Sequence, residues 1–385
     1  MEKIKGKYDV VVVGGGIAGV SASVSAKRNG VNVCLIEKNY ALGGLATLGN
    51  VNDYLPLCDG MGNQVISGIA EELLFLSIKD GYGKIPDCWK EKGDIEERKK
   101  YRYRVEFNPV SFMLSLEEFV IKEGVEIRYG TKVCDVIKGN DSIRFLIIED
   151  KEGKGLIECK VVIDATGDAD ICYFSGEETV SSNKNVACGW FFYFDGEKIK
   201  KYPFSEKYDP YNKIVPDNND GFSGVNSKDI TKQILKSRKY IREKIEELRE
   251  GNPFIFPVSI PTIPTFRMTR RLKGKTELKE EDERKIFQDT VGMCGDWRKR
   301  GPVYYIPFSC LIAVKTKNLI TAGRCISAST AWDIIRSIPV CALTGEISGT
   351  ASAILCKEKI ESFSHLDLEN LKTLLIKQGN IIKKL

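Results

Sequence analysis

The segment from Tyr8 to Lys38 constrains the fold more than any other part of the chain. Its letters, YDVVVVGGGIAGVSASVSAKRNGVNVCLIEK, predict a buried strand, a glycine turn, a helix and a second strand. Gly14, Gly16 and Gly19 follow the G-x-G-x-x-G spacing. In that spacing the first glycine permits a tight turn, the second lets backbone approach a pyrophosphate, and the third lets the helix pack on the strand. The segment therefore predicts a dinucleotide-binding α/β unit.

The acid at the end of the second strand strengthens this interpretation. Glu37 occupies the position at which a carboxylate accepts hydrogen bonds from a ribose, and an acid there favours a free 2′-hydroxyl. The helix that begins near Ile17 directs its unpaired N–H groups and positive dipole end at the phosphates. A glycine turn that binds no nucleotide is the weaker interpretation, because triplet, flanking strand, helix and spaced acid occur together.

Length and charge exclude several classes of protein. The chain has 385 residues, which predicts about two domains at roughly 150 residues each. Lys and Arg number 58 against 53 Asp and Glu, an excess too mild to indicate a nucleic-acid partner, and no basic block is interleaved with aromatics. Residues 1–7 lack the apolar core of a signal peptide, and no apolar run is long enough to span a bilayer. We therefore expect no membrane association.

Cysteine and histidine usage limits the chemistry. The chain has 12 cysteines, but none form a C-x-x-C pair, so we expect reduced thiols, no metal site and a cytoplasmic location. His365 is the only histidine and lies in a polar segment near the C-terminus. A histidine base, a Ser-His-Asp triad and a histidine-rich metal site are therefore improbable, and we expect proton transfer to use other side chains.

The order of predicted elements indicates one domain interrupted by another. Residues 1–175 continue the nucleotide-binding unit with helices at 63–78 and 108–124 and strands at 125–129, 132–138, 143–149 and 156–164. Residues 176–317 contain an aromatic strand at 186–194, a polar stretch at 200–227 and a charged amphipathic helix at 227–250. The polar stretch suits a lid and a surface excursion equally well.

The chain then returns to the first domain over residues 318–385, with a strand at 318–322 and a helix of small residues at 338–355. Gly345 and Gly349 inside that helix mark close packing, because interior glycines otherwise weaken a helix. We predict a Rossmann-like domain, a parallel sheet with helices on both faces, into which an α+β substrate or cap domain is inserted. A second G-x-G-x-x-G unit is missing from the sequence, which argues against a separate nicotinamide domain.

Six segments in a fixed order carry a resemblance to a known family. They are the N-terminal fingerprint, GGLAT at 43–47, VIDATGDAD at 162–170, FRMTRRLKG at 266–274, NLITAGRCIS at 318–327 and WDIIRSIPVCALTGEISGTAS at 332–352. Together they resemble the bacterial FAD-dependent oxidoreductases of the glutathione-reductase-like flavoprotein superfamily, a group often described as fumarate-reductase-like. The resemblance covers most of residues 8–356.

The resemblance implies FAD as the cofactor and assigns positions to it. Pyrophosphate and ribose would be held by Gly14, Gly15, Gly16, Ile17, Ala18, Gly19, Glu37 and Lys38. Pyrophosphate, ribityl chain and flavin ring would lie along Gly43, Gly44, Ala46 and Thr47, and the adenosine half near Val133, Ala165, Thr166 and Gly167. The second flavin contact would comprise Gly323, Arg324, Pro339 and Gly345, with the helix N-terminus at Pro339 facing the pyrimidine edge. Arg324 departs from the Gly-Asp pair that many relatives carry.

Catalytic candidates follow from the need to handle one proton beside the flavin. We select Arg267, Arg270, Tyr304 and Arg336, because arginine binds carboxylate or phosphate bidentately and Arg336 directly precedes the flavin-facing helix. The alternative for Arg270 is a structural ion pair between elements. Cys325 is interpreted as a packing thiol rather than a flavin attachment point.

These residues indicate an enzyme that transfers a hydride between a small polar, carboxylate- or hydroxyl-bearing substrate and flavin N5. Reduction of an activated C=C bond is the alternative, and a non-catalytic NAD- or nucleotide-binding protein is the alternative from another class. A monooxygenase or halogenase is a weaker rival, since Asp164 is not followed by glycine and VACGWFFYF lacks a W-x-W-x-I-P pattern. The expected partners are the small-molecule substrate and an unidentified electron donor or acceptor, and a homo-oligomer is left open.

Overall fold

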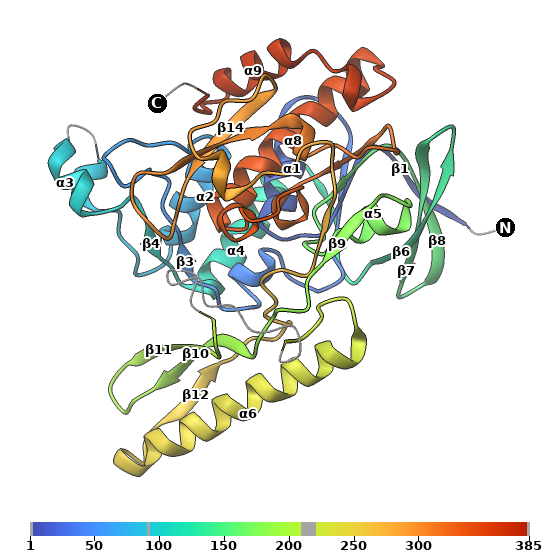
Figure 1. Ribbon diagram of the computed structural model, residues 1–385. Coiled ribbons are helices and arrows are strands. Elements are labelled where there is room, and N and C mark those ends of the chain that lie inside the picture. Colours follow the sequence, from blue (N-terminus) through green and yellow to red (C-terminus); the bar gives the residue numbers. More distant parts are fainter. Residues whose placement is uncertain (1–2, 91–92, 209–220, 383–385) are drawn as a thin grey trace.

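A seven-stranded sheet forms the centre of the molecule in this computed structural model, which describes residues 3–90, 93–208 and 221–382 (Figure 1). Five strands pair in parallel in the order β5 (Glu126–Arg128), β2 (Val33–Ile36), β1 (Ile4–Val13), β8 (Gly153–Asp164) and β16 (Leu319–Thr321). The antiparallel strands β7 (Ser142–Asp150) and β6 (Lys132–Gly139) extend the sheet from the other half of β8. The predicted α/β fold class and its parallel sheet are confirmed.

Alternation of side chains along β1 places two different layers on the two faces of the sheet. Val10 and Val12 pack in the core formed with α1 (Ile17–Arg28) and α8 (Ile338–Glu358). Val11 and Val13 pack on the other face with side chains of β6, β7 and the short helix α5 (Asp170–Phe174). The second face is therefore covered by an antiparallel hairpin and one short helix.

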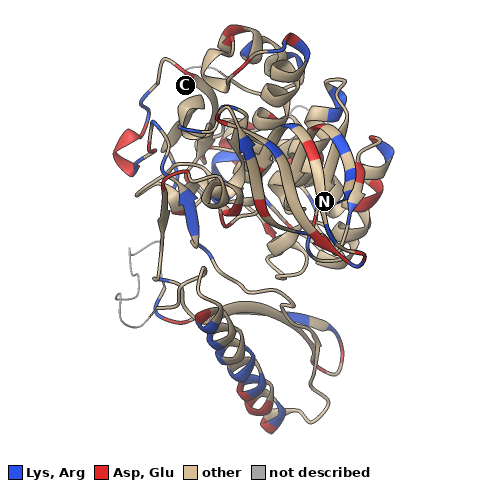
Figure 2. Ribbon diagram, turned by 90° about the vertical axis from the view of Figure 1, so that its right-hand side faces the viewer, with Lys and Arg blue, Asp and Glu red and all other residues tan. Residues whose placement is uncertain are grey.

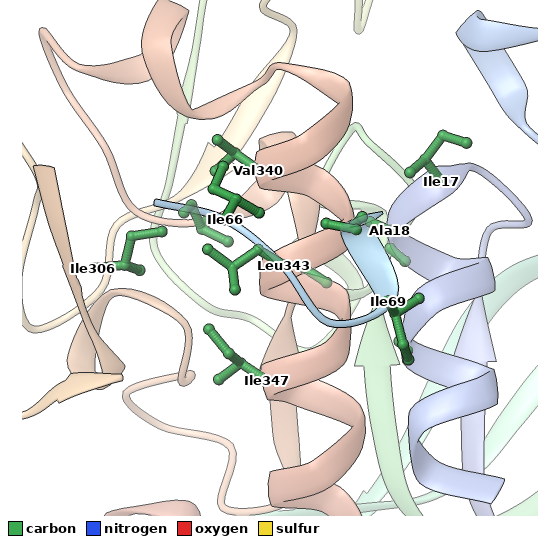
Figure 3. Packing of buried hydrophobic residues seen from close by; sticks show 14 of the residues in the cluster. Ile17, Ala18, Ile66, Ile69, Ile306, Val340, Leu343 and Ile347 are labelled. Carbon is green, nitrogen blue, oxygen red and sulfur yellow. The ribbon is translucent and has the colours of Figure 1, made fainter. Parts of the chain in front are cut away.

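Helices α1 and α8 approach closely because small residues line their contact. A Cβ atom at Gly345 would lie 2.3 Å from the carbonyl oxygen of Ala18. Ser21 and Ser25 donate hydrogen bonds of 2.6 and 2.9 Å to carbonyl oxygens of α8. The large apolar side chains of both helices, including Ile17, Val340 and Leu343, instead contact the surrounding core (Figure 3). The expectation that glycine marks close packing in this helix is confirmed.

The expectation that no apolar run is long enough to span a bilayer is wrong for α8, which is the one helix within the described residues that is long and apolar enough to do so. However, 94% of its apolar window is buried inside the protein. A helix that is apolar on every side suits a position between α1, the sheet and the β14–β15 hairpin (Thr290–Gly295 and Val303–Pro307).

Further elements surround this centre. They are η1 (Gly44–Ala46), β3 (Asp53–Tyr54), α2 (Ile69–Ile78), η2 (Asp87–Trp89), α3 (Ile95–Lys100), β4 (Val105–Glu106), α4 (Pro109–Lys122), η3 (Glu280–Asp282), η4 (Phe308–Cys310), η5 (Gly323–Cys325), α7 (Trp332–Ile335), η6 (Phe363–His365) and α9 (Leu368–Lys377). The predicted helix at 108–124 is confirmed as α4, with Asn108 as its N-cap. The helix predicted at 63–78 begins later, at Ile69, because Gln64 bridges to Cys58 and Gly68 has a positive φ of 63°.

A separate layer projects from this body, at the bottom of Figure 1. It consists of the antiparallel strands β11 (Ile199–Ser205), β10 (Cys188–Phe194) and β12 (Phe256–Ser259), covered on one face by α6 (Ser227–Gly251). A short ladder between β9 (Thr179–Ser181) and β13 (Arg270–Leu272) lies where the chain leaves and re-enters the main body. Domain limits of 176–317 remain a prediction, although β14 and β15 pack in the main core. The predicted polar stretch at 200–227 includes residues 209–220, which lie outside the described residues.

Candidate functional site

The glycine turn after β1 is shaped by two contacts that exclude side chains. Gly14 has a positive φ of 104°, and a Cβ there would lie 2.5 Å from the carbonyl oxygen of Ala165. A Cβ at Gly19 would lie 1.8 Å from the carbonyl oxygen of Gly14. These two glycines therefore serve the close packing of turn, helix and neighbouring strand.

Gly16 differs from both, because a Cβ atom built there meets no protein atom within 4 Å. Gly16 is also the N-cap of α1, whose first turn has no side-chain cap and no acidic residue. Ile17 and Ala18 therefore present backbone N–H groups at the positive end of the helix dipole. Open space, uncapped donors and positive potential are what a pyrophosphate requires, so this part of the chain fits the phosphates of FAD.

Glu37 lies at the end of β2 and is buried. One carboxylate oxygen accepts a hydrogen bond of 2.6 Å from the backbone of Gly15, and the other accepts two of 2.7 Å from Asn39. These bonds fix the carboxylate beside the glycine turn, and each oxygen retains acceptor capacity for a ribose hydroxyl. Lys38 is exposed, whereas Val133 is buried in β6.

The GGLAT segment is held next to the glycine turn. Gly43 donates a backbone hydrogen bond of 2.8 Å to Gly15, and Gly43 and Gly16 form a parallel bridge. Gly44 and Ala46 belong to η1, and the buried Thr47 hydroxyl donates to the carbonyl oxygen of Leu42 at 2.5 Å. The backbone of this segment and that of the N-terminal fingerprint therefore lie side by side.

The turn after β8 and the segment after β16 also meet. Ala165 donates a backbone hydrogen bond to β1, and Thr166 bonds its hydroxyl to Asp164 at 2.7 Å. Arg324 donates to the carbonyl oxygen of Gly167 at 2.5 Å and forms an ion pair of 2.8 Å with Asp168. The arginine that follows Gly323 therefore holds the turn after β8 in place.

The same segment contains two further positions of interest. Gly323 donates its backbone N–H to the Thr344 hydroxyl at 2.9 Å, which ties it to α8. Cys325 is fully buried and accepts backbone hydrogen bonds from Gly167 and Ala169. Burial raises the pKa of the Cys325 thiol well above its usual value, so it is present as an unreactive thiol.

The N-terminus of α8 is the second uncapped helix end in this region. Its N-cap, Ser337, makes no side-chain cap, and Pro339 occupies the first turn. Gly345 lies farther along the same helix, at the contact with α1. Uncapped N–H groups at this end favour negative charge nearby.

A cluster of ionisable side chains directly precedes α8. Asp333 of α7 accepts hydrogen bonds at one carboxylate oxygen from Arg336 and from the hydroxyl of Tyr208. The Tyr208 hydroxyl also accepts from Arg336 at 3.1 Å, and the guanidinium of Arg267 lies 4.3 Å from the centre of the Tyr208 ring. The indole of Trp297 donates to the carbonyl oxygen of Asp333 at 2.9 Å. The second carboxylate oxygen of Asp333 is buried without a hydrogen-bond partner among the described residues.

Electrostatics fix the protonation states of this cluster near neutral pH. Burial alone would raise the pKa of Asp333, but the charge of Arg336 and the hydrogen bond from Tyr208 outweigh it and lower that pKa. Burial raises the pKa of Tyr208 above its usual value. Asp333 is therefore ionised, Tyr208 keeps its proton, and the two arginines leave the cluster with one net positive charge.

The other catalytic candidates have different surroundings. Arg270 pairs with Asp170 at 2.5 Å and stacks over Tyr173 at 4.4 Å. Tyr304 is buried in β15 and donates its hydroxyl to the carbonyl oxygen of Glu280 at 3.3 Å. Of the four candidates, the structure thus joins Arg267 and Arg336 through Tyr208.

Sequence reasoning missed Tyr208, Asp333 and Trp297. The spacing of Asp333 and Arg336, three residues apart just before a helix, was an available signal for an ion pair. Tyr208 gave no such signal, since it meets the pair from 125 positions away in the chain.

Comparison with known proteins places these observations in a family. The family model described as FAD dependent oxidoreductase matches residues 9–191 and 190–375, nearly the whole chain. A thioredoxin reductase of Ureaplasma parvum serovar 3 is 38% identical over 71 residues, which is 18% of this chain and 23% of the reductase. The chain therefore matches less than a quarter of the length of that relative.

Solved structures share the fold at low sequence identity. A geranylgeranyl bacteriochlorophyll reductase-like protein from Thermoplasma acidophilum superposes with a TM-score of 0.50 at 15% identity, over 97% of this chain and 84% of that one. BexE, studied for oxidation during BE-7585A biosynthesis, has a TM-score of 0.53 at 12% identity, over 97% of this chain and 69% of its own. A variant of the flavin-dependent brominase Bmp2 has a TM-score of 0.50 at 13% identity, over 96% and 84%. At these identities the likeness concerns the fold alone.

Proposed function

The chain belongs to the FAD-dependent oxidoreductase family, and from that premise we propose that it transfers a hydride between a small polar substrate and N5 of the flavin. The substrate class is a molecule that bears a carboxylate or hydroxyl group. Membership of a family of oxidoreductases sets aside the non-catalytic alternative.

The residues of the two uncapped helix ends would hold the cofactor. Gly16 and the first turn of α1 would bind the pyrophosphate, and Glu37 would bind the ribose. The flavin half would lie along η1, with its pyrimidine edge at the N-terminus of α8. When bound, FAD supplies the centre that accepts or donates the hydride. All remaining work, which is substrate binding, orientation and proton handling, belongs to side chains of this chain.

The observation that carries the proposal is the cluster at the start of α8. Arg267 and Arg336 supply two positive charges against the one negative charge of Asp333, so the cluster attracts an anionic group. Arg336 uses part of its guanidinium on Asp333 and Tyr208, which fixes its plane for a carboxylate. We therefore infer that the two arginines orient the substrate.

Proton handling follows from the protonation states. When a hydroxyl substrate is oxidised, its C–H leaves as a hydride and its O–H proton needs an acceptor. The unpartnered, ionised oxygen of Asp333 suits that role. The alternative reaction is the reduction of an activated C=C bond, in which a hydride is added to one carbon and a proton to the other. Tyr208 holds a proton that it can donate to the second carbon. The protonated Tyr208 is the specific feature that keeps this reductase as the second candidate.

The remaining partners are also proposals. A separate electron donor or acceptor would complete each cycle, because the sequence has one dinucleotide fingerprint. We further propose that the enzyme works in the cytoplasm with its thiols reduced.

An anaerobic panel tests the reaction and its direction. FAD-loaded protein is mixed with hydroxy acids, and loss of the flavin's visible absorbance is the expected result for a dehydrogenase. Chemically reduced protein is mixed in parallel with unsaturated carboxylates, and recovery of the absorbance is expected for the reductase. A Tyr208→Phe variant should slow the second reaction more than the first. Failure of the protein to retain FAD would refute the proposal.

A further inference from the structure

The aromatic strand β10 has two different faces. Phe191 and Tyr193 pack against Ile241 and Ile245 of α6. Because side chains alternate along a strand, Trp190, Phe192 and Phe194 lie on the opposite face. We call this second face of the β11–β10–β12 sheet the aromatic face.

The neighbours of Phe192 show where the aromatic face is directed. Residues directly opposite in an antiparallel pair share one face, and Phe192 lies opposite Lys201 on β11 and Ser259 on β12. Lys201 forms an ion pair of 2.7 Å with Glu106, and Ser259 accepts a hydrogen bond of 3.0 Å from Asn50. Both partners belong to the main body, just after the GGLAT segment and in β4. The aromatic face is therefore turned toward the FAD-binding domain.

This face remains partly uncovered. The rings of Phe194 and Phe256 pack 5.2 Å apart, yet Phe256 is 49% exposed and the neighbouring Ile199 is 60% exposed. The charged residues of this layer lie on α6 and at the turn end of the β10–β11 hairpin, whereas β10 and β12 carry none (Figure 2). A concentrated apolar surface with partial exposure is typical of a binding site.

The inner end of the aromatic face lies next to the charged cluster at the start of α8, which comprises Arg267, Tyr208, Asp333 and Arg336. Ser205 lies opposite Cys188, which places it on the same face as Trp190 and Phe192. Arg267 donates to the Ser205 hydroxyl at 3.1 Å and also stacks on Tyr208. From Trp190 to Phe194 the face runs outward from this cluster for roughly 13 Å, at the usual rise of a strand.

We propose that the aromatic face binds the apolar body of the substrate, whose anionic end lies at Arg267 and Arg336. The substrate is then an amphipathic carboxylate with an aromatic or aliphatic body rather than a uniformly polar molecule. This inference rests on the proposed function, which places the polar group of the substrate at the cluster. Substrate binding explains why β10 carries aromatic residues on both faces, although α6 covers only the face of Phe191 and Tyr193.

A bilayer surface fits this face less well. Asn252, just beyond α6, bonds to Asp195 at the outer turn of β10, so the last turns of α6 lie at the outer end of the sheet. That helix covers the opposite face, whereas the aromatic face is turned toward the main body through Lys201 and Ser259, where a flat bilayer has no room.

Calorimetry with a series of straight-chain carboxylates, butanoate to decanoate, tests the proposal on FAD-loaded protein. We expect Kd to fall by up to about fourfold for each added methylene, as burial of a methylene on an apolar surface predicts. Phe192→Ser and Phe256→Ser should flatten this dependence, with the largest loss of affinity for decanoate and the smallest for butanoate. Phe254→Ser is the matched control, because Phe254 is 72% exposed and precedes β12.

The outcomes separate this inference from the proposed function, since calorimetry needs no turnover. Chain-length-dependent binding that the two face variants reduce supports the inference even when no donor bleaches the flavin. A Kd that is independent of chain length overturns it, even when short hydroxy acids bleach the flavin. Equal loss in the Phe254→Ser control also overturns it. Dissociation of a dimer by Phe256→Ser, with carboxylate binding unchanged, would assign the face to a second copy and overturn it too.

Discussion

Glu346 should make stability depend on pH, because it is a carboxyl group buried in the middle of α8. It is 1% exposed, and its carboxylate accepts a hydrogen bond of 2.9 Å from the backbone of Ile69 at the start of α2. Burial raises the pKa of Glu346 from 4.5 to about 7, although the hydrogen bond from Ile69 opposes part of the rise. A raised pKa means that the folded state holds the proton more tightly than the unfolded chain does.

The size and sign of the effect follow from that shift. The contribution of the protonated carboxyl is fully present below pH 4.5 and is lost as pH rises through about 7. The total loss is about 3 kcal/mol by linkage. Glu346→Gln keeps an acceptor for Ile69 but has no charge to bury. We therefore expect the variant to match the wild type near pH 5 within about 1 kcal/mol and to exceed it by about 3 kcal/mol near pH 8.

Urea unfolding followed by circular dichroism at both pH values measures this difference. Glu118→Gln is the control, because Glu118 is an exposed partner of Lys79, and such surface pairs contribute little to stability. A stability difference between Glu346→Gln and wild type that is the same at both pH values would refute the reasoning. Loss of stability at high pH in the variant would do so as well, since it would show that the charge is needed there.

Three further predictions concern the cofactor and the cluster. Glu37→Ala should weaken FAD binding by about 1 to 3 kcal/mol, measured by equilibrium titration of the apoprotein, and unchanged affinity would contradict the ribose contact. Gly16→Ala should leave the Tm of the apoprotein nearly unchanged and weaken FAD binding. Gly19→Ala should lower the Tm, because its Cβ would lie 1.8 Å from a carbonyl oxygen. An equal loss of Tm in the two variants would contradict the open space at Gly16. Asp333→Asn should lower kcat for hydroxy-acid oxidation by about 10²- to 10⁴-fold with FAD affinity retained, and a kcat within twofold of wild type would remove Asp333 from the mechanism.

Local patterns predicted the FAD-binding half of the molecule well. The strand, glycine turn and helix at residues 8–38 were recognisable from residue spacing within one short segment, as was the cap of α4 by Asn108. The small residues of α8 also revealed their role, because interior glycine is unfavourable without a close partner. The start of α2 was placed too early, since the positive φ of Gly68 is set by surroundings that a helical pattern does not encode.

The charged cluster was harder to predict because its members come from distant parts of the chain. Arg336 was selected for its place before a helix, and the structure supplies its partner Asp333 and the contact with Tyr208. Arg267 and Arg270 are three residues apart, just before and at the start of β13, yet one joins the cluster and the other pairs with Asp170. Only the path of the inserted layer decides between them, and that path has no local sequence signal.

The return of the chain to its first domain has a consequence for biosynthesis. β1 pairs with β8, β8 pairs with β16, and α1 packs against α8, more than three hundred positions later. The first strand and helix therefore leave the ribosome long before the elements that cover them have been made. Chaperones have a long interval in which to bind these exposed apolar surfaces. Stable FAD retention by a growing chain should begin only after α8 has emerged, so truncation before residue 338 should leave the first domain unable to retain flavin.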